Sequence, residues 1–118
     1  MRTVNTLALT PTDKAITVTA DDRDPQAGNM SHDYSVKGPT FETLLHFQHG
    51  PIAEFGVNGI TNEALLSIIR DRLEGAQEGL YRCRENALAI TAIEEASLWL
   101  AKRTLDRMTR GVEGQNKA

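Results

Sequence analysis

The chain has 118 residues, of which 40% are hydrophobic and 25% are charged, as in a typical folded protein. Its length fits one ordinary domain, and a domain this small buries only a modest core. The formal charge of −3 at pH 7 argues against a nucleic acid polymer as partner, because binding to a polyanion depends largely on positive charge. We therefore expect a single domain over residues 1–118 that covers further apolar surface by forming a homo-oligomer.

No apolar run approaches the roughly 20 residues needed to cross a bilayer, and Met1, Arg2 and Thr3 lead into no apolar secretory segment. We therefore expect a cytoplasmic protein that has no membrane partner. The single Cys83 excludes an intramolecular disulfide and a cysteine-rich metal site.

The first half of the chain predicts a small antiparallel sheet of about three strands. Residues 1–15 have no strong period and are interpreted as a flexible or loosely paired lead-in. Residues 16–20 alternate apolar and polar side chains, residues 32–36 can form a returning strand, and residues 41–47 carry one mostly apolar face. The segments between the strands are rich in turn-forming residues, and residues 50–59 have no periodic stretch long enough for a helix. Residues 16–60 are thus predicted to be a β meander followed by a connector.

The second half predicts an antiparallel two-helix hairpin over residues 61–111. Thr61 or Asn62 can cap the first helix, and apolar residues then recur at a spacing of three to four until Gly79. A second amphipathic helix runs from about Arg84 to Arg110, and a glycine follows it. Residues 112–118 form a polar tail that we expect to be frayed. The predicted fold class is α+β, with the sheet before the hairpin.

Catalytic machinery is not evident in the sequence, so we expect no catalytic residue, no metal and no cofactor. A hydrolase or transferase would be expected to display a metal cluster, an activated nucleophile or a carboxylate pair. His46 and His49 are a poor metal pair because their side chains would leave a strand and its turn on opposite faces, and His32 could join them only through a tertiary contact. We expect a binding protein and not an enzyme.

Basic residues at the end of the second helix are the most informative candidates for ligand binding. Arg103, Arg107 and Arg110 are spaced by four and three positions, which places them on one helix face. These cations could simply complement the negative end of the helix and improve solubility. They could also hold phosphate, because a guanidinium group offers permanently charged, bidentate donors.

Aromatic and amide side chains supply candidates for contacts with a nucleobase. Tyr34 and Phe47 could stack on a base, and Asn58 or Asn86 could bind its polar edge. Each of these residues could equally serve the core, and the sequence leaves both interpretations open.

Longer stretches of the sequence resemble a known family. The strings HFQHGPIAEFGVNGITNEALL (46–66), DRLEGAQEG (71–79), CRENALAIT (83–91) and KRTLDRMTRGVEG (102–114) resemble phage proteins of the anti-CBASS and anti-Thoeris hairpin family. The upstream DDRDPQAGNMSHDY (21–34) with its flanking strands makes the resemblance closer to the Thoeris anti-defence branch. The resemblance covers about residues 16–114.

The resemblance implies a sponge, a protein that binds cyclic nucleotide immune signals in the host bacterial cytoplasm and withholds them from host effectors without cleaving them. Implied ligands are cyclic ADP-ribose isomers and, in related members, cyclic di- or trinucleotides. The family also implies dimers that assemble further, often to hexamers, with ligand held between protomers. Two alternatives remain: an enzyme that degrades such signals, and a structural or regulatory phage protein whose hairpin binds another protein.

Overall fold

The computed structural model describes residues 1–115, and the chain divides into two compact units between Ile60 and Thr61. This boundary lies where the sequence analysis separates the connector from the hairpin. None of the helices in the described range is long and apolar enough to span a membrane.

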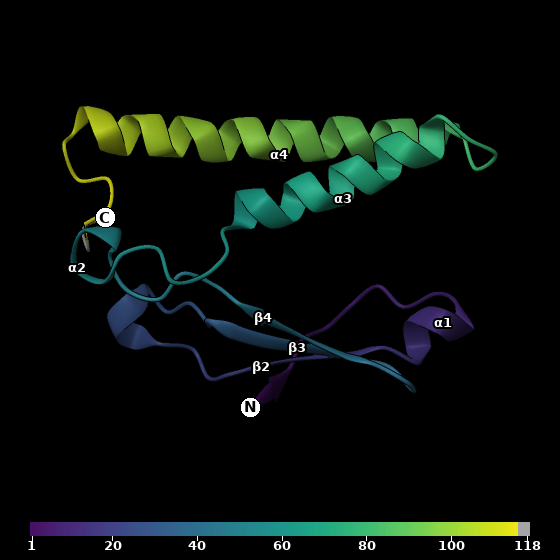
Figure 1. Ribbon diagram of the computed structural model, residues 1–118, viewed down its shortest axis with the longest axis horizontal. Coiled ribbons are helices and arrows are strands. Elements are labelled where there is room, and N and C mark those ends of the chain that lie inside the picture. Colours follow the sequence, from purple (N-terminus) through teal and green to yellow (C-terminus); the bar gives the residue numbers. More distant parts are fainter. Residues whose placement is uncertain (116–118) are drawn as a thin grey trace. The chain divides into compact units, whose positions relative to one another are not determined.

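The first unit contains a four-stranded antiparallel sheet in the order β1-β2-β3-β4 (Figure 1). The strands are β1 (Arg2–Thr3), β2 (Thr17–Ala20), β3 (Asp33–Lys37) and β4 (Glu42–His46). The predicted meander is confirmed as β2, β3 and β4, each paired with the next. The additional strand, β1, pairs with β2 and lies in the lead-in that we expected to be flexible or loosely paired. Two residues are too few for an alternating pattern to be recognised in a sequence.

Short helices in the first unit were not predicted. They are α1 (Pro11–Lys14), the 3-10 helix η1 (Pro25–Ala27) and α2 (Ile52–Phe55). The Thr10 side chain caps α1 by accepting a hydrogen bond from the Asp13 N–H. The Asp24 side chain likewise caps η1 by accepting a hydrogen bond from the Gln26 N–H. The expectation that the connector holds no helix is wrong for α2, whose four residues are fewer than helical periodicity requires for recognition.

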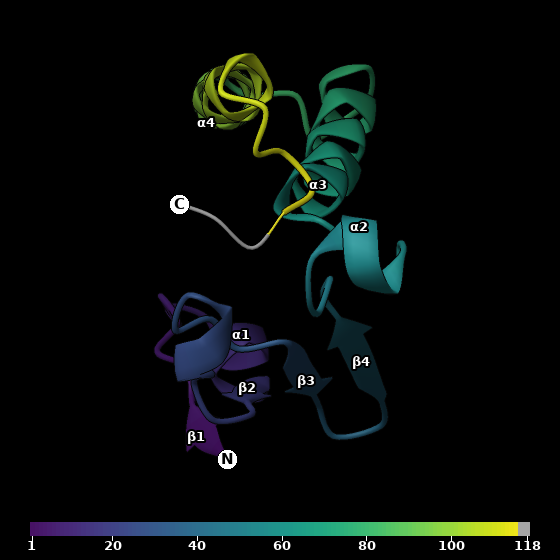
Figure 2. The same cartoon turned by 90° about the vertical axis from the view of Figure 1, so that its left-hand side faces the viewer.

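The second unit is the predicted hairpin, formed by α3 (Asn62–Gln77) and α4 (Arg84–Thr109), which run antiparallel (Figures 1 and 2). The predicted cap is confirmed as Thr61, whose hydroxyl accepts from the Ala64 N–H. Gly111 follows α4 with φ of 71°, the left-handed conformation that ends many helices. The fold class predicted from the sequence is therefore confirmed.

The helices α3 and α4 pack against each other, and half-buried side chains form a regular stripe along α4. Along α4 the stripe advances by four and three positions alternately, as in packed helical pairs. Its members are Asn86, Ile90, Ile93, Ser97, Leu100, Thr104 and the buried Arg107. No apolar side chain of either helix is buried in the described chain. The hairpin alone therefore leaves much of its apolar surface accessible to solvent.

The tail folds back where fraying was expected. Residues 113–115 are tied to α4 by hydrogen bonds from Arg107, while residues 116–118 lie outside the described residues. The Arg107 guanidinium orders this turn by donating to the Glu113 carboxylate and the Gln115 carbonyl. These partners lie six and eight residues from Arg107, a spacing that leaves no periodic signal in the sequence.

Candidate functional site

The arginines predicted to bind phosphate differ in their availability. Arg103 and Arg110 are exposed, and the side chain of neither forms a hydrogen bond or ion pair within residues 1–115. Arg107 is only 8% exposed, and its Nε donates to Glu113 Oε2 at 2.9 Å. Its terminal nitrogen also donates to the carbonyl oxygens of Val112 and Gln115. Arg107 therefore orders the turn after α4, and a phosphate would have to compete with Glu113 for it.

Asn58 is part of a hydrogen-bonded loop in the connector. Its side-chain oxygen accepts from the His49 N–H at 2.8 Å, and its Nδ2 donates to the His49 carbonyl at 2.7 Å. An amide side chain has two N–H donors and two acceptor lone pairs, so one of each remains for a ligand. The side chain of Gln48 completes the loop, because it accepts from the Asn58 N–H and donates to the carbonyls of Gly50 and Gly56.

The backbone approaches itself closely where this loop rejoins the sheet. Phe47 forms a parallel bridge with Ile60, and the His46 carbonyl accepts from the Ile60 N–H at 2.8 Å. A Cβ atom added to Gly59 would lie 2.5 Å from the carbonyl carbon of Phe47, closer than real Cβ contacts. Glycine at this position therefore permits the loop to close.

Tyr34 and Phe47 are brought together by the sheet. Their rings meet edge to face with centroids 5.4 Å apart, and both side chains are half-buried. The arrangement accounts for a structural role of each ring and still leaves part of each accessible to a ligand.

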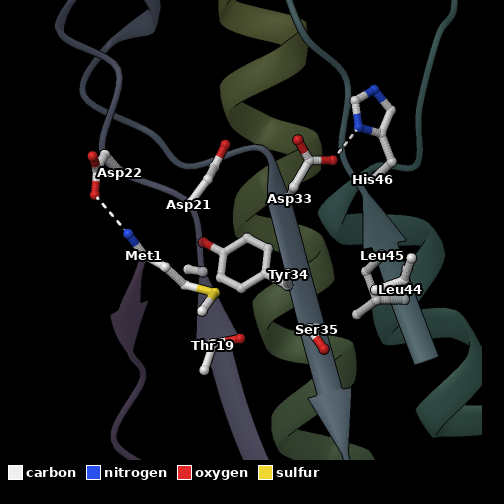
Figure 3. Close-up of a pocket in the computed structure, with 11 residues that line it drawn as sticks. Met1, Thr19, Asp21, Asp22, Asp33, Tyr34, Ser35, Leu44, Leu45 and His46 are labelled. Atoms are coloured by element: carbon white, nitrogen blue, oxygen red, sulfur yellow. Dashed lines mark hydrogen bonds and ion pairs between the residues drawn. The ribbon is translucent and has the colours of Figure 1, made fainter. Parts of the chain in front are cut away.

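A depression of about 560 Å³ lies at the end of the sheet where β2 and β4 finish and β3 begins. Figure 3 shows the Tyr34 ring in its middle, with Met1 on one side and Leu44 and Leu45 on the other. Its polar lining includes Asp21, Asp22 and Asp33, of which Asp22 pairs with the N-terminal amine and Asp33 with His46 Nδ1. With three carboxylates around it, this depression is an unfavourable place for a phosphate.

Asn86 lies at the opposite end of α4 from the arginines. Its Nδ2 donates to the Tyr81 carbonyl at 3.1 Å, within the turn between the two helices. The 17 positions between Asn86 and Arg103 correspond to about 26 Å along a helix. One copy of α4 therefore cannot bring both residues to a single small ligand.

The structure also brings together three residues that the sequence analysis did not combine. Asp24 Oδ2 lies 3.2 Å from His32 Nε2 and 3.4 Å from His49 Nε2. The two imidazole rings are stacked, with centroids 3.9 Å apart and planes inclined by 12°. His46, which we compared with His49 in the sequence, instead contacts Asp33. The three residues follow no metal-binding motif, so their proximity is visible only in the folded chain.

Two comparisons with known proteins give a consistent assignment for the chain. Residues 45–105 match the family described as Acb2/Tad1, hairpin domain. The chain is also 49% identical over 73 residues to the protein "Thoeris anti-defense 1" of Bacillus phage SBSphiJ7. This alignment covers 62% of the chain and 51% of that protein, so the chain spans about half the length of the curated relative it matches.

Proposed function

The chain belongs to the Acb2/Tad1 hairpin family, and from this premise we propose that it is a Thoeris anti-defence protein that sequesters a cyclic nucleotide immune signal. The observation that carries the proposal is the 49% identity to "Thoeris anti-defense 1" of a Bacillus phage. We further propose that it acts in the host bacterial cytoplasm as a sponge, which binds cyclic ADP-ribose isomers or cyclic di- and trinucleotides without cleaving them.

Apolar surface on α4 supports a homo-oligomer as the functional form. Leu98, Trp99, Leu105 and Met108 are each more than half exposed, and α4 is ten residues longer than α3. Large apolar side chains gain free energy when a partner covers them, at about 25 cal/mol per Å² of apolar area removed from water. We expect dimers that pair through α4 and assemble further, with hexamers as the larger form.

Pairing of α4 helices also explains how distant site residues could meet. Antiparallel packing against a second copy would bring Asn86 of one chain toward Arg103 of the other, although the two lie about 26 Å apart within one helix. A ligand enclosed between protomers could thus contact residues from both ends of α4. This arrangement would complete a site that is incomplete in one chain.

The ligand's phosphates are assigned to the arginine stripe of Arg103, Arg107 and Arg110. Arg103 and Arg110 are exposed and have donors that no group within residues 1–115 uses, while Arg107 can contribute if its Glu113 contact is exchanged for phosphate. Charge-assisted bonds from guanidinium to phosphate are among the stronger hydrogen bonds in proteins. The stripe is the best source of local positive charge for an anionic signal.

The base and ribose are assigned to the other predicted residues. Phe47 or Tyr34 would pack on the adenine, Asn58 would use its remaining donor and acceptor on a ribose or base edge, and Asn86 would supply a second amide. A sponge competes through affinity, and nanomolar binding requires about 12 kcal/mol at the 1 M standard state. Enclosure of the ligand by several such groups and exclusion of water can supply this affinity.

The direct test separates binding from cleavage. Pure protein is mixed with cyclic ADP-ribose isomers and with cyclic di- and trinucleotides, binding is measured by calorimetry, and the complex is then heat-denatured. We expect one class of ligand to bind tightly and to be released intact, as identified by mass spectrometry.

Two other outcomes would overturn the proposal. Recovery of a cleaved nucleotide would identify an enzyme that degrades the signal. Failure of every nucleotide to bind the pure oligomer would favour a regulatory phage protein that binds a protein partner through the hairpin.

A further inference from the structure

Asp24, His32 and His49 form a compact cluster within the first unit, and their potential ligand atoms all lie within 4.8 Å of one another. They come from three segments: the cap of η1, the residue before β3, and the connector after β4. His32 is 4% exposed, while the side chains of Asp24 and His49 are 29% and 53% exposed. The cluster therefore has one buried, fixed member and one side open to solvent.

The hydrogen bonds around Asp24 orient its free oxygen toward both histidines. Oδ1 accepts from the Gln26 N–H at 3.0 Å, which leaves Oδ2 facing both imidazoles. An aspartate side chain is ordinarily a carboxylate at neutral pH, the form in which it ligates a metal.

The two separations that involve Asp24 fit the ligand shell of a small divalent ion. Zinc bonds of about 2.0–2.1 Å to nitrogen and oxygen, arranged tetrahedrally, place neighbouring ligand atoms about 3.3 Å apart. The two separations from Asp24 Oδ2, 3.2 Å to His32 Nε2 and 3.4 Å to His49 Nε2, lie on either side of this value. We propose that Asp24, His32 and His49 form a binding site for a divalent transition metal, with zinc as the ion that suits these ligands.

Ring orientation sets the movement that binding requires. The rings are within 12° of parallel, so their Nε2 lone pairs do not converge on one point. His49 must therefore tilt toward the ion. Its exposed side chain can do so while Asn58 holds its backbone through two hydrogen bonds. His32 is buried, and its N–H donates to Asp21 Oδ1, so it keeps its position.

This assignment goes beyond signal sequestration and differs from the expectation of no metal drawn from the sequence. A bound ion would link three segments of the first unit and would immobilise the connector that carries Asn58. Three protein ligands leave a fourth position for water. The expected consequence is a metal-dependent increase in the thermal stability of the protein.

The test uses the full chain, with any affinity tag removed and residual metal stripped by a chelator. Co²⁺ reports coordination geometry through its visible absorption bands, and Zn²⁺ binding is followed by calorimetry and thermal unfolding. We expect one ion per chain, the spectrum of four-coordinate Co²⁺, and a higher Tm in the presence of Zn²⁺.

Variants assign the ligands. His49→Gln removes an exposed ligand. Loss of an outer-shell partner alone can lower metal affinity by up to about 100-fold, so the affinity of this variant for Zn²⁺ should fall by more than that. Asp24→Asn, which retains a side-chain oxygen to cap η1, should show the same loss. His46→Gln is the matched control, because His46 contacts Asp33 instead of this cluster, and it should bind Zn²⁺ like the unmodified protein.

Two results would overturn the assignment. The first is a protein that shows no four-coordinate Co²⁺ spectrum and no Tm increase with Zn²⁺, which would identify the cluster as a hydrogen-bonded group only. The second is equal metal affinity in the His49→Gln and His46→Gln proteins. Since these readouts do not involve the nucleotide, they remain decisive even if the proposed signal binding fails.

Discussion

Arg103 is the residue for which ligand binding can be tested with the least disturbance of the fold. Its guanidinium is exposed and unused within the described part of the chain, so Arg103→Gln removes positive charge without breaking an internal contact. Hydrogen bonds to charged groups contribute about 1.5–3 kcal/mol, and we therefore expect the affinity for a cyclic nucleotide to fall about 10- to 100-fold. Calorimetry measures the affinity, and thermal unfolding should show an unchanged Tm.

The neighbouring Lys102 provides a matched control for this substitution. It is exposed on the same helix and pairs with Asp106 at 3.1 Å, so Lys102→Gln removes the same charge from an adjacent position. An equal loss of affinity in both variants would indicate a nonspecific effect of net charge and would contradict a specific role for Arg103.

Gly59 permits the connector to close against the end of β4. Gly59→Ala places a Cβ against the carbonyl group of Phe47 and the Gln48 nitrogen, both backbone groups that cannot rotate away. We expect the free energy of unfolding to fall by about 1–3 kcal/mol, the usual cost of overpacking. Urea unfolding measures the change. A stability equal to that of the unmodified protein would show that the loop relaxes freely.

At the scale of single elements, Gly75 lies within α3 and weakens it. Apart from its chain neighbours and the nearby backbone of α3, no atom of the described residues lies within 4 Å of a Cβ built at this position, so alanine fits without a clash. Because glycine loses more backbone entropy than alanine on entering a helix, Gly75→Ala should raise the free energy of unfolding by about 0.5–1 kcal/mol. Urea unfolding should therefore show that glycine to alanine lowers the free energy of unfolding at Gly59 and raises it at Gly75. Destabilisation by Gly75→Ala would instead indicate that a partner packs closely against this position.

At the scale of the whole molecule, the exposed apolar residues of α4 predict assembly. Leu98 and Leu105 are 71% and 61% exposed, and burial of either in an interface would make a charge at that position costly. Leu98→Glu combined with Leu105→Glu should shift the protein from oligomer to monomer, as measured by light scattering after size exclusion.

Lys102→Glu serves as the control for this assembly test, because it introduces the same carboxylate on an exposed polar position of α4. It should leave the mass of the assembly unchanged. If the double leucine variant keeps that mass as well, the apolar face of α4 does not form the interface.

The hairpin was predictable from sequence because its determinants are local. The Thr61 cap contacts a residue three positions away, and the apolar spacing of each helix is contained within that helix. The cap therefore specifies where α3 begins, and periodicity specifies the apolar face of each helix. The family resemblance was likewise carried by continuous strings of residues.

Tertiary structure decided the features that depend on contacts between distant residues. β1 forms only because Arg2 and Thr3 meet β2, and Arg107 is engaged because the turn after α4 folds back onto it. The proximity of Asp24 and His32 to His49 requires the sheet and the connector together. Local sequence patterns do not reveal such contacts, because the contacts form when distant segments pack together and do not depend on the conformational preference of any one segment.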